Sequence, residues 1–121
     1  MKLGKKISGG RYHKRRKKQK HELVRTPRVV KLAETKKKTL RVRGGNEKTV
    51  LLKENKINLI DKKTKKTTKA QIKNVLETPS NRFLARQNVL TKGAIVETDK
   101  GKAKITNRPG QEGNVQGVLI E

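Results

Sequence analysis

A dense run of basic residues near the N-terminus, at positions 4–28, limits what this part of the chain can fold into. Together with Lys2, it holds twelve basic side chains and one acidic side chain, Glu22. Because like charges repel and apolar side chains are few, burial cannot offset the entropy lost when the backbone becomes ordered. We therefore expect an arm that is solvated and largely disordered in isolation, and that becomes ordered on a large, negatively charged partner.

The charge of the whole chain predicts the same kind of partner. Its 121 residues include 34 Lys and Arg but only 10 Asp and Glu, a formal net charge of +24. This balance is typical of proteins that bind nucleic acids. A membrane partner is not expected, because there is no broad apolar helix face and no apolar run of about twenty residues. The basic N-terminus lacks the apolar segment of a signal peptide and cysteine is absent, so we expect a cytoplasmic protein.

The apolar content allows only one small core. Hydrophobic residues make up 30% of the chain, and Tyr12 and Phe83 are its only aromatic residues. We therefore predict two parts, a basic arm at residues 1–27 and a single β domain at residues 28–121. The scarcity of aromatic rings argues against a platform on which several bases stack, so contacts to phosphates are expected to carry most of the binding.

Short runs with strand character recur through the second part, separated by turn signals. Residues 36–39 are predicted to form a polar turn, and Gly44, Gly45 and Asn46 a tight hairpin turn, because they tolerate positive φ. The predicted strands are residues 28–32, 40–43, 48–53, 57–60, 67–77, 94–98, 101–106 and 115–120.

The longest predicted strand, at residues 67–77, alternates imperfectly. Ala70, Ile72 and Leu76 share one side, which we expect to face the core, but Asn74 falls on the same side. Strands of this length and spacing are typical of an all-β barrel or sandwich. The fold prediction is an all-β protein, with a small barrel-like antiparallel domain, one short helix and an extended basic arm.

The one predicted helix spans residues 79–87. Thr78 is suited to cap its start, and Pro79 suits the first helical position. Arg82 and Arg86 lie four positions apart in this helix, so they should share a face that could straddle phosphates.

Groups that could converge for catalysis are few. Glu97 and Asp99 could pair their carboxylates, but they are better explained as solvent-facing residues of a lysine-rich hairpin. His13 and His21 lie in the basic arm, where we expect phosphate or ribose as neighbours rather than a metal ion. The glycines at 9–10 lack the strand and helix of a phosphate-binding loop. We therefore predict no enzymatic activity, no metal site and no cofactor.

Other basic residues stand beside turns that could admit a phosphate. Arg41 and Arg43 should project from one side of their strand, next to glycines that allow close approach to the backbone. Arg108 lies in a polar loop with Gln111. The arm has no helical period for reading a DNA major groove, and no helix-turn-helix or zinc-finger spacing appears. An irregular arm on a small β domain is better suited to threading between packed RNA helices.

Seven stretches, in an order that covers nearly the whole chain, form a specific combination. They are Ser8-Gly9-Gly10-Arg11 with a basic run and Glu22-Leu23, Arg41-Val42-Arg43-Gly44-Gly45-Asn46, Asn81-Arg82, Thr91-Lys92-Gly93-Ala94-Ile95, Glu97-Thr98, Arg108-Pro109-Gly110 and Val118-Leu119-Ile120-Glu121. The combination resembles the eighth small-subunit ribosomal protein family of the archaeal and eukaryotic type, in its compact archaeal form. The chain departs from the family pattern at Val24, where a glycine is expected, and at Phe83, Leu84 and Gln87, which replace more polar or basic residues.

The resemblance implies a structural constituent of the small ribosomal subunit, with small-subunit rRNA and neighbouring small-subunit proteins as partners. It implies no activity and no cofactor, and no homo-oligomer is expected. Together with the charges of the arm, it makes the following residues candidates for rRNA binding: Lys5, Lys6, Gly9, Gly10, Arg11, Lys14, Arg15, Arg16, Lys17, Lys18, Lys20, Arg25, Arg28, Arg41, Arg43, Gly44, Gly45, Asn46, Asn81, Arg82, Arg86 and Arg108.

Two other functions remain open. A ribosome assembly factor built on the same domain would leave the mature subunit. A histone-like DNA-binding protein would need a preference for duplex DNA and a dimer interface, for which the sequence shows no exposed apolar stripe.

Overall fold

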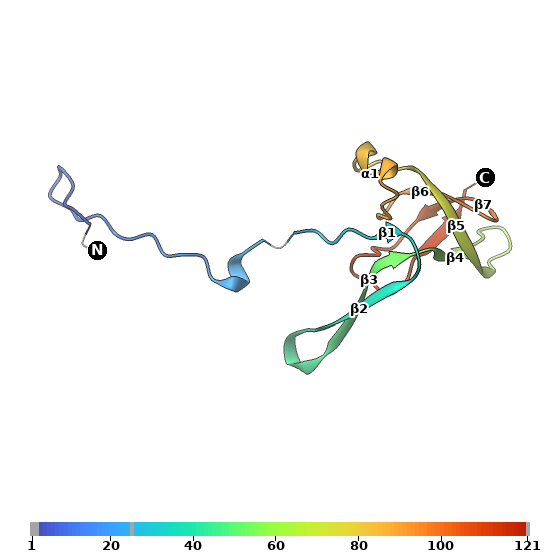
Figure 1. The fold of residues 1–121 in the computed structure, drawn as a ribbon, viewed down its shortest axis with the longest axis horizontal. Helices are drawn as coiled ribbons and strands as arrows, with labels where there is room; N and C mark the ends of the chain where they lie inside the picture. Colours follow the sequence, from blue (N-terminus) through green and yellow to red (C-terminus); the bar gives the residue numbers. More distant parts are fainter. Residues whose placement is uncertain (1–2, 25, 121) are drawn as a thin grey trace.

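Strands dominate the fold, which the computed structural model describes for residues 3–24 and 26–120 (Figure 1). The all-β prediction is confirmed, with one short α-helix and two 3-10 helices among the described residues. In chain order the elements are η1 (Lys20–Glu22), β1 (Lys31–Leu32), β2 (Lys36–Arg41), η2 (Arg43–Gly45), β3 (Glu47–Glu54), β4 (Lys56–Ile60), β5 (Thr67–Glu77), α1 (Arg82–Arg86), β6 (Ile95–Thr98), β7 (Gly101–Ile105) and β8 (Gln116–Leu119).

Strands β4 to β8 close into a barrel. Consecutive strands pair antiparallel, but β4 and β8 close the barrel in parallel, with Leu59 opposite Gly117. This pair departs from the antiparallel prediction because its two strands are far apart in the chain, and no hairpin constrains their direction. The strands approach closely here: a Cβ atom on Gly117 would lie 2.8 Å from Ile57 Cδ1 and 3.1 Å from the Lys104 carbonyl oxygen.

The core consists of small and branched aliphatic side chains. In β7, for example, Ala103 and Ile105 are buried, while Lys102 and Lys104 are exposed, as the two-residue period of a strand predicts. Neither aromatic residue takes part, since both rings are more than half exposed. The buried core cluster is formed by Val30, Leu51, Ile57, Leu59, Ala70, Ile72, Val75, Leu90, Ala94, Val96, Ala103, Ile105 and Val115.

Strand β5 changes its inward face midway along its length. Ala70 and Ile72 are buried as predicted, but the next buried residue is Val75, and Leu76 is 42% exposed. The pairing of β5 with β6 shifts its register on both sides of Val75. Such shifts mark β-bulges, which move the following side chains to the opposite face. The prediction that Leu76 faces the core is therefore wrong.

A second sheet, in the order β1, β3, β2, lies beside the barrel. Strand β3 is antiparallel to β2 and parallel to β1, and its Leu51 reaches the barrel core. The far end of the β2–β3 hairpin extends away from the barrel (Figure 1). The polar turn predicted at residues 36–39 is wrong, because pairing with β3 holds these residues in β2. Arg43, predicted in a strand, lies in η2 at the hairpin end.

The helix α1 is shorter than predicted and begins at a different cap. Asn81 caps it, with its side-chain oxygen accepting a hydrogen bond from Phe83 N at 3.0 Å. Thr78 Oγ1 is buried and has no hydrogen-bond partner among the described residues, so Thr78 does not cap the helix. Its carbonyl accepts from Asn81 N at 3.0 Å, so residues 78–81 form a turn before the helix starts. The predicted start at Pro79 is therefore wrong, because the turn at residues 78–81 places Asn81 at the start of the helix.

The segment that enters the barrel is held by main-chain and side-chain hydrogen bonds. Val30 is 1% exposed, and its carbonyl accepts from Leu90 N at 2.8 Å. Arg28 Nη1 donates to the Gly110 carbonyl at 2.8 Å. Residues 3–24, in contrast, are exposed apart from the partly buried Glu22, and they run away from the barrel (Figure 1).

Candidate nucleic-acid interface

The far end of the arm folds back into a small turn that gathers five of the predicted residues. Lys6 N donates to Gly10 O at 2.7 Å, and Gly9 N donates to Lys6 O at 3.0 Å. Gly9 has φ +80°, a conformation that glycine adopts without strain. Lys5 and Arg11 form an isolated antiparallel bridge across this turn. The turn therefore presents basic side chains around a short stretch of glycine backbone.

The middle of the arm is extended, and its basic cluster is exposed. Lys14, Arg15, Arg16, Lys17 and Lys18 belong to no helix or strand, and each has an exposed side chain. Without a regular element, their side chains have no common face, which suits contact with phosphates on several sides rather than reading of one groove.

Glu22 folds the next part of the arm back on itself. Its Oε1 accepts from Arg16 Nη2 at 2.6 Å, and its Oε2 accepts from Gln19 N at 2.9 Å. These contacts hold the 3-10 turn η1, which includes Lys20. The Arg16 guanidinium and then the Gln19 N–H stabilise the carboxylate, so the pKa of Glu22 is lowered from its ordinary value. His21 Nε2 lies 3.9 Å from the same carboxylate.

Arg28 stands where the arm meets the barrel. Its guanidinium is exposed, but one of its donors is used on the Gly110 carbonyl. The other N–H groups of the guanidinium can still donate to a phosphate, so Arg28 can anchor the chain and contact a ligand at the same time. The candidate Arg25 lies outside the described residues.

The β2–β3 hairpin carries a second group of predicted residues. Gly44 and Gly45 have φ +76° and +79°, and they turn the chain through η2. Asn46 stabilises this turn, because its carbonyl accepts from Val42 N at 2.8 Å. Arg43 is exposed within the turn. The glycine-rich hairpin end predicted from the sequence is confirmed.

Sequence reasoning missed the lysines further along this hairpin. Lys36, Lys37 and Lys38 are exposed in β2, and Lys48 in β3 donates to Gln111 Oε1 at 2.6 Å. A signal was present in the sequence. The two strands pair outward from the glycine turn, so Lys38 lies opposite Val50, as far before the turn as Val50 lies after it.

The loop at residues 108–113 lies beside the hairpin, to which the Lys48–Gln111 hydrogen bond joins it. Asn107 holds this loop from within, since its amide nitrogen donates to Glu112 Oε2 and to the Asn114 carbonyl, both at 2.8 Å. Arg108 is exposed at the start of the loop. Arg108, Arg28 and the hairpin lysines are thus on connected parts of the fold.

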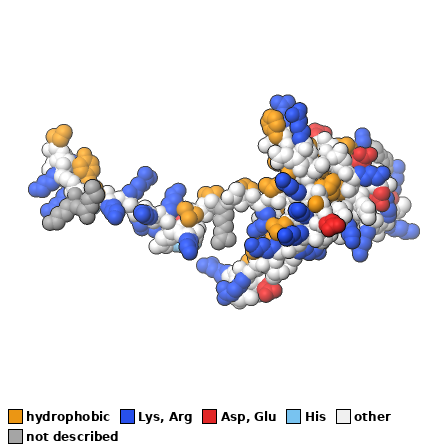
Figure 2. Space-filling model, in the orientation of Figure 1, with side chains coloured by type: hydrophobic (Ala, Val, Ile, Leu, Met, Phe, Trp, Pro, Cys, Tyr) orange, Lys and Arg blue, Asp and Glu red, His pale blue; other side chains and the backbone are white. Residues whose placement is uncertain are grey.

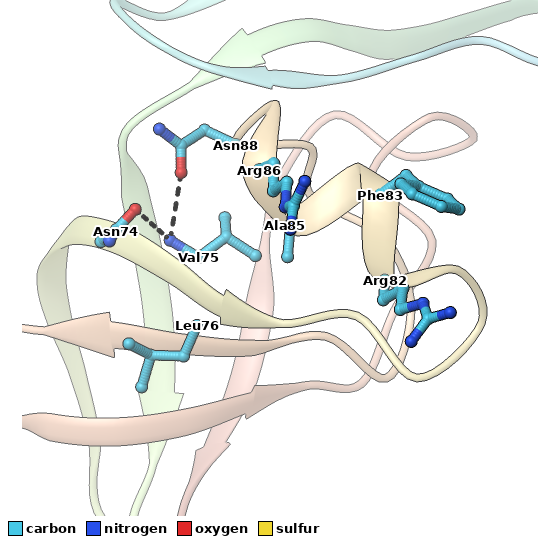
Figure 3. Close-up of a pocket in the computed structure, with 8 residues that line it drawn as sticks. All are labelled: Asn74, Val75, Leu76, Arg82, Phe83, Ala85, Arg86 and Asn88. Atoms are coloured by element: carbon cyan, nitrogen blue, oxygen red, sulfur yellow. Dashed lines mark hydrogen bonds between the residues drawn. The ribbon is translucent and has the colours of Figure 1, made fainter.

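The last predicted group borders a hollow between β5 and α1 (Figure 3). Arg82 and Arg86 both line it, as their spacing of four predicts. Asn81 has a different use, because its side-chain oxygen already caps the helix. The sequence did not indicate that Phe83 would line the same hollow with an exposed ring.

Basic side chains are spread over the arm, the hairpin and the visible face of the barrel, with acidic side chains scattered among them (Figure 2). Even one-to-one pairing of the 10 acidic residues would leave 24 of the 34 Lys and Arg without a carboxylate. A surface of this kind attracts polyanions and releases their counterions on binding.

The described residues give little support to a catalytic carboxylate pair, a metal site or a membrane-spanning helix. Asp99 Oδ1 accepts from Gln71 N at 3.2 Å, and Glu97 is exposed. Residues 3–24 and 26–120 hold no group of three or more His, Cys, Asp or Glu placed to bind a metal ion. Within the same ranges, no helix is long and apolar enough to span a membrane.

Comparison with known proteins gives a consistent result over nearly the whole chain. A family model described as ribosomal protein S8e matches residues 2–120. The chain is 53% identical over 113 residues to the small ribosomal subunit protein eS8 of Nanoarchaeum equitans, covering 93% of this chain and 89% of the relative. The identity is 46% over 116 residues for eS8 of Methanocorpusculum labreanum, with coverages of 96% and 93%. For eS8 of Staphylothermus marinus it is 45% over 117 residues, with coverages of 96% and 91%.

Proposed function

This chain belongs to the ribosomal protein S8e family, and we propose that it binds rRNA, through its arm at residues 1–27 and through basic loops of its β domain at residues 28–121. Its role is structural and not enzymatic, as a component of the small ribosomal subunit in the cytoplasm. Its neighbours are small-subunit rRNA and other proteins of the subunit.

The observation that carries the rRNA proposal is the exposure of the arm. Residues 3–24 make no packed contact with the barrel that would bury them, yet they contain a large share of the chain's positive charge. A segment of this composition gains no stability from its own apolar contacts. Phosphates of a folded RNA supply the missing partner, and the arm becomes ordered as its Lys and Arg neutralise them and release counterions.

The β domain gives the arm a defined point of entry. Burial of Val30 and the hydrogen bond from Arg28 to Gly110 hold the chain at the barrel, so the arm leaves the domain from one place. The hairpin and the loop at residues 108–113 carry basic residues near this place. The domain therefore fixes where the arm begins and adds phosphate contacts of its own, while the arm extends to phosphates far from the domain.

Sedimentation of a cell lysate through a sucrose gradient tests the proposal. Under a high-salt wash that strips loosely held factors, the chain should remain in the mature small-subunit peak at about one copy per subunit. Salt weakens each phosphate contact, but an arm threaded through folded rRNA dissociates slowly. A known loosely bound factor, stripped by the same wash, is the control.

Two results would contradict the proposal in different ways. Recovery only in pre-subunit fractions would indicate an assembly factor on the same domain. Recovery with the nucleoid would indicate a DNA-binding protein.

A further inference from the structure

The ring of Phe83 stands exposed on the surface of the β domain. The side chain is 59% exposed, and it is the only aromatic side chain outside the arm. Leu76, turned outward by the bulge in β5, is 42% exposed and lines the same hollow. Leaving such apolar area in water is unfavourable, so a ligand that covers the ring gains free energy.

The hollow next to this ring is large enough for a nucleotide. It has a volume of about 640 Å³ and lies between β5 and α1, within the range typical of small-molecule sites. Figure 3 shows Asn74 and Asn88 at one end, Phe83 and Arg82 at the other, and Arg86 between them. The amide, cationic and aromatic groups therefore border the hollow in that order, with the Phe83 ring directed outward, away from the asparagines (Figure 3).

Hydrogen bonds from Val75 N orient the side chains of Asn74 and Asn88, and their amide nitrogens can donate to a ligand. Asn74 Oδ1 and Asn88 Oδ1 both accept from Val75 N, at 2.9 and 3.4 Å. Within the described part of the chain, their amide nitrogens have no hydrogen-bond partner. Amide nitrogens of this kind can donate to the ring nitrogens and carbonyl oxygens of a base edge, or to a ribose oxygen.

The cationic groups favour an anionic ligand that also carries a flat ring. Arg82 Cζ lies 5.7 Å from the centroid of the Phe83 ring, so a guanidinium plane and an aromatic face are close together. Bases that are unpaired in RNA stack on both kinds of surface. No acidic residue of the ranges 3–24 and 26–120 lines the hollow, so a phosphate can approach Arg86 without repulsion from a carboxylate of these residues.

We infer that this hollow binds one unpaired nucleotide of RNA, whose base stacks on Phe83 and whose phosphate contacts Arg86, while Asn74 and Asn88 donate to the backbone of the adjoining nucleotide. The inference rests on the proposed binding of rRNA and adds to it a site that recognises a local RNA shape. The arm contacts phosphates whatever their sequence or pairing. This hollow distinguishes a bulged or looped-out nucleotide from a paired one.

Binding of the full chain to two RNA hairpins tests the site. One hairpin carries a single bulged adenosine, and the other is the same hairpin fully paired. The wild-type chain should bind the bulged hairpin roughly 5- to 160-fold more tightly, the range that stacking of one base supplies. Phe83→Leu, which keeps an apolar side chain but removes the ring, should abolish this preference. Phe83→Tyr, which keeps the ring, should retain it.

The fully paired hairpin is the internal control, because Phe83→Leu should bind it as the wild type does. Thermal unfolding of each variant checks that the barrel is intact, as expected for a side chain that is more than half exposed. If Phe83→Leu keeps the preference for the bulge, or if the wild type binds both hairpins equally, the nucleotide site is wrong, and a protein neighbour becomes the better partner for the ring. Failure of the wild type to bind either RNA would instead contradict the proposed function.

Discussion

At the scale of single residues, one acidic side chain holds a turn in the arm. Glu22 is the only acid among a dozen basic residues in this part of the chain, and it bonds both to the Arg16 guanidinium and to the Gln19 backbone. These contacts hold the 3-10 turn η1 in the described part of the arm. A single carboxylate therefore supplies local order in a segment whose other charges repel each other.

The first prediction concerns the titration of Glu22. Because its pKa is lowered when Arg16 and Gln19 N are in place, the turn is stabilised above the ordinary carboxyl pKa and loses this support as the pH falls through the lowered value. NMR titration of the Glu22 carboxyl carbon should give a midpoint below that of a free glutamate. Arg16→Gln should move the midpoint back toward the ordinary value.

Lys17→Gln is the matched control, since it removes the same charge one residue away and leaves the contact to Glu22 unchanged. A midpoint that shifts equally in both variants would show that general charge, and not the Arg16 contact, lowers the pKa.

At the scale of elements, the β2–β3 hairpin combines two roles. Strand β2 is at the edge of its sheet, where exposed lysines oppose unwanted pairing with another chain. The same lysines, Lys36, Lys37 and Lys38, extend the basic surface from the glycine turn toward the barrel. The lysines that keep the edge of β2 from pairing with another chain in the free protein are therefore available to contact phosphates in the complex with RNA.

The second prediction concerns these three lysines. Replacing Lys36, Lys37 and Lys38 by glutamine should weaken RNA binding and make the slope of log K against log salt shallower by about 2 to 3, because each phosphate contact contributes roughly 0.7 to 0.9. Thermal unfolding should change little, since all three side chains are exposed. The slope is measured by filter binding over a series of salt concentrations.

The control replaces Lys62, Lys65 and Lys66 by glutamine. These residues belong to the β4–β5 loop, on the side of the barrel away from the arm (Figure 1), and their loss removes the same net charge. If both triple variants change the slope equally, net charge rather than the hairpin determines binding.

At the scale of the whole molecule, the protein joins a stable barrel to an arm without a core. The barrel closes on itself, so it needs no partner to complete its hydrogen bonds, whereas the arm buries almost nothing. Folding of the arm and binding of RNA are therefore expected to be one event.

The third prediction is a steep dependence of RNA affinity on salt. If about eight arm charges contact phosphates, the slope of log K against log salt should be near −6 to −7. Replacing Lys14, Arg15, Lys17 and Lys18 by glutamine should make it shallower by about 3. A wild-type slope shallower than about −2 would mean that the arm is largely uninvolved.

Local sequence was a good guide where neighbouring residues decide the structure. Alternating and β-branched residues predicted β5 with its observed ends, the glycine pair predicted the hairpin end, and the charge run predicted the exposure of the described arm residues. The candidate RNA-binding residues themselves stay a prediction, but most of the described ones lie where the sequence suggested, on exposed turns or on the arm.

The sequence alone therefore determined the all-β class, the single aliphatic core and a basic surface, because these follow from composition and from periods of a few residues. Only the tertiary structure decided that Lys36 to Lys38 pair with β3, that a bulge turns Leu76 outward, and that β4 meets β8 in parallel. Each of these depends on a partner distant in the chain, whose register sets which side chains are covered. The hollow beside Phe83 also depends on the tertiary structure, because it forms only where β5 and α1 pack against each other.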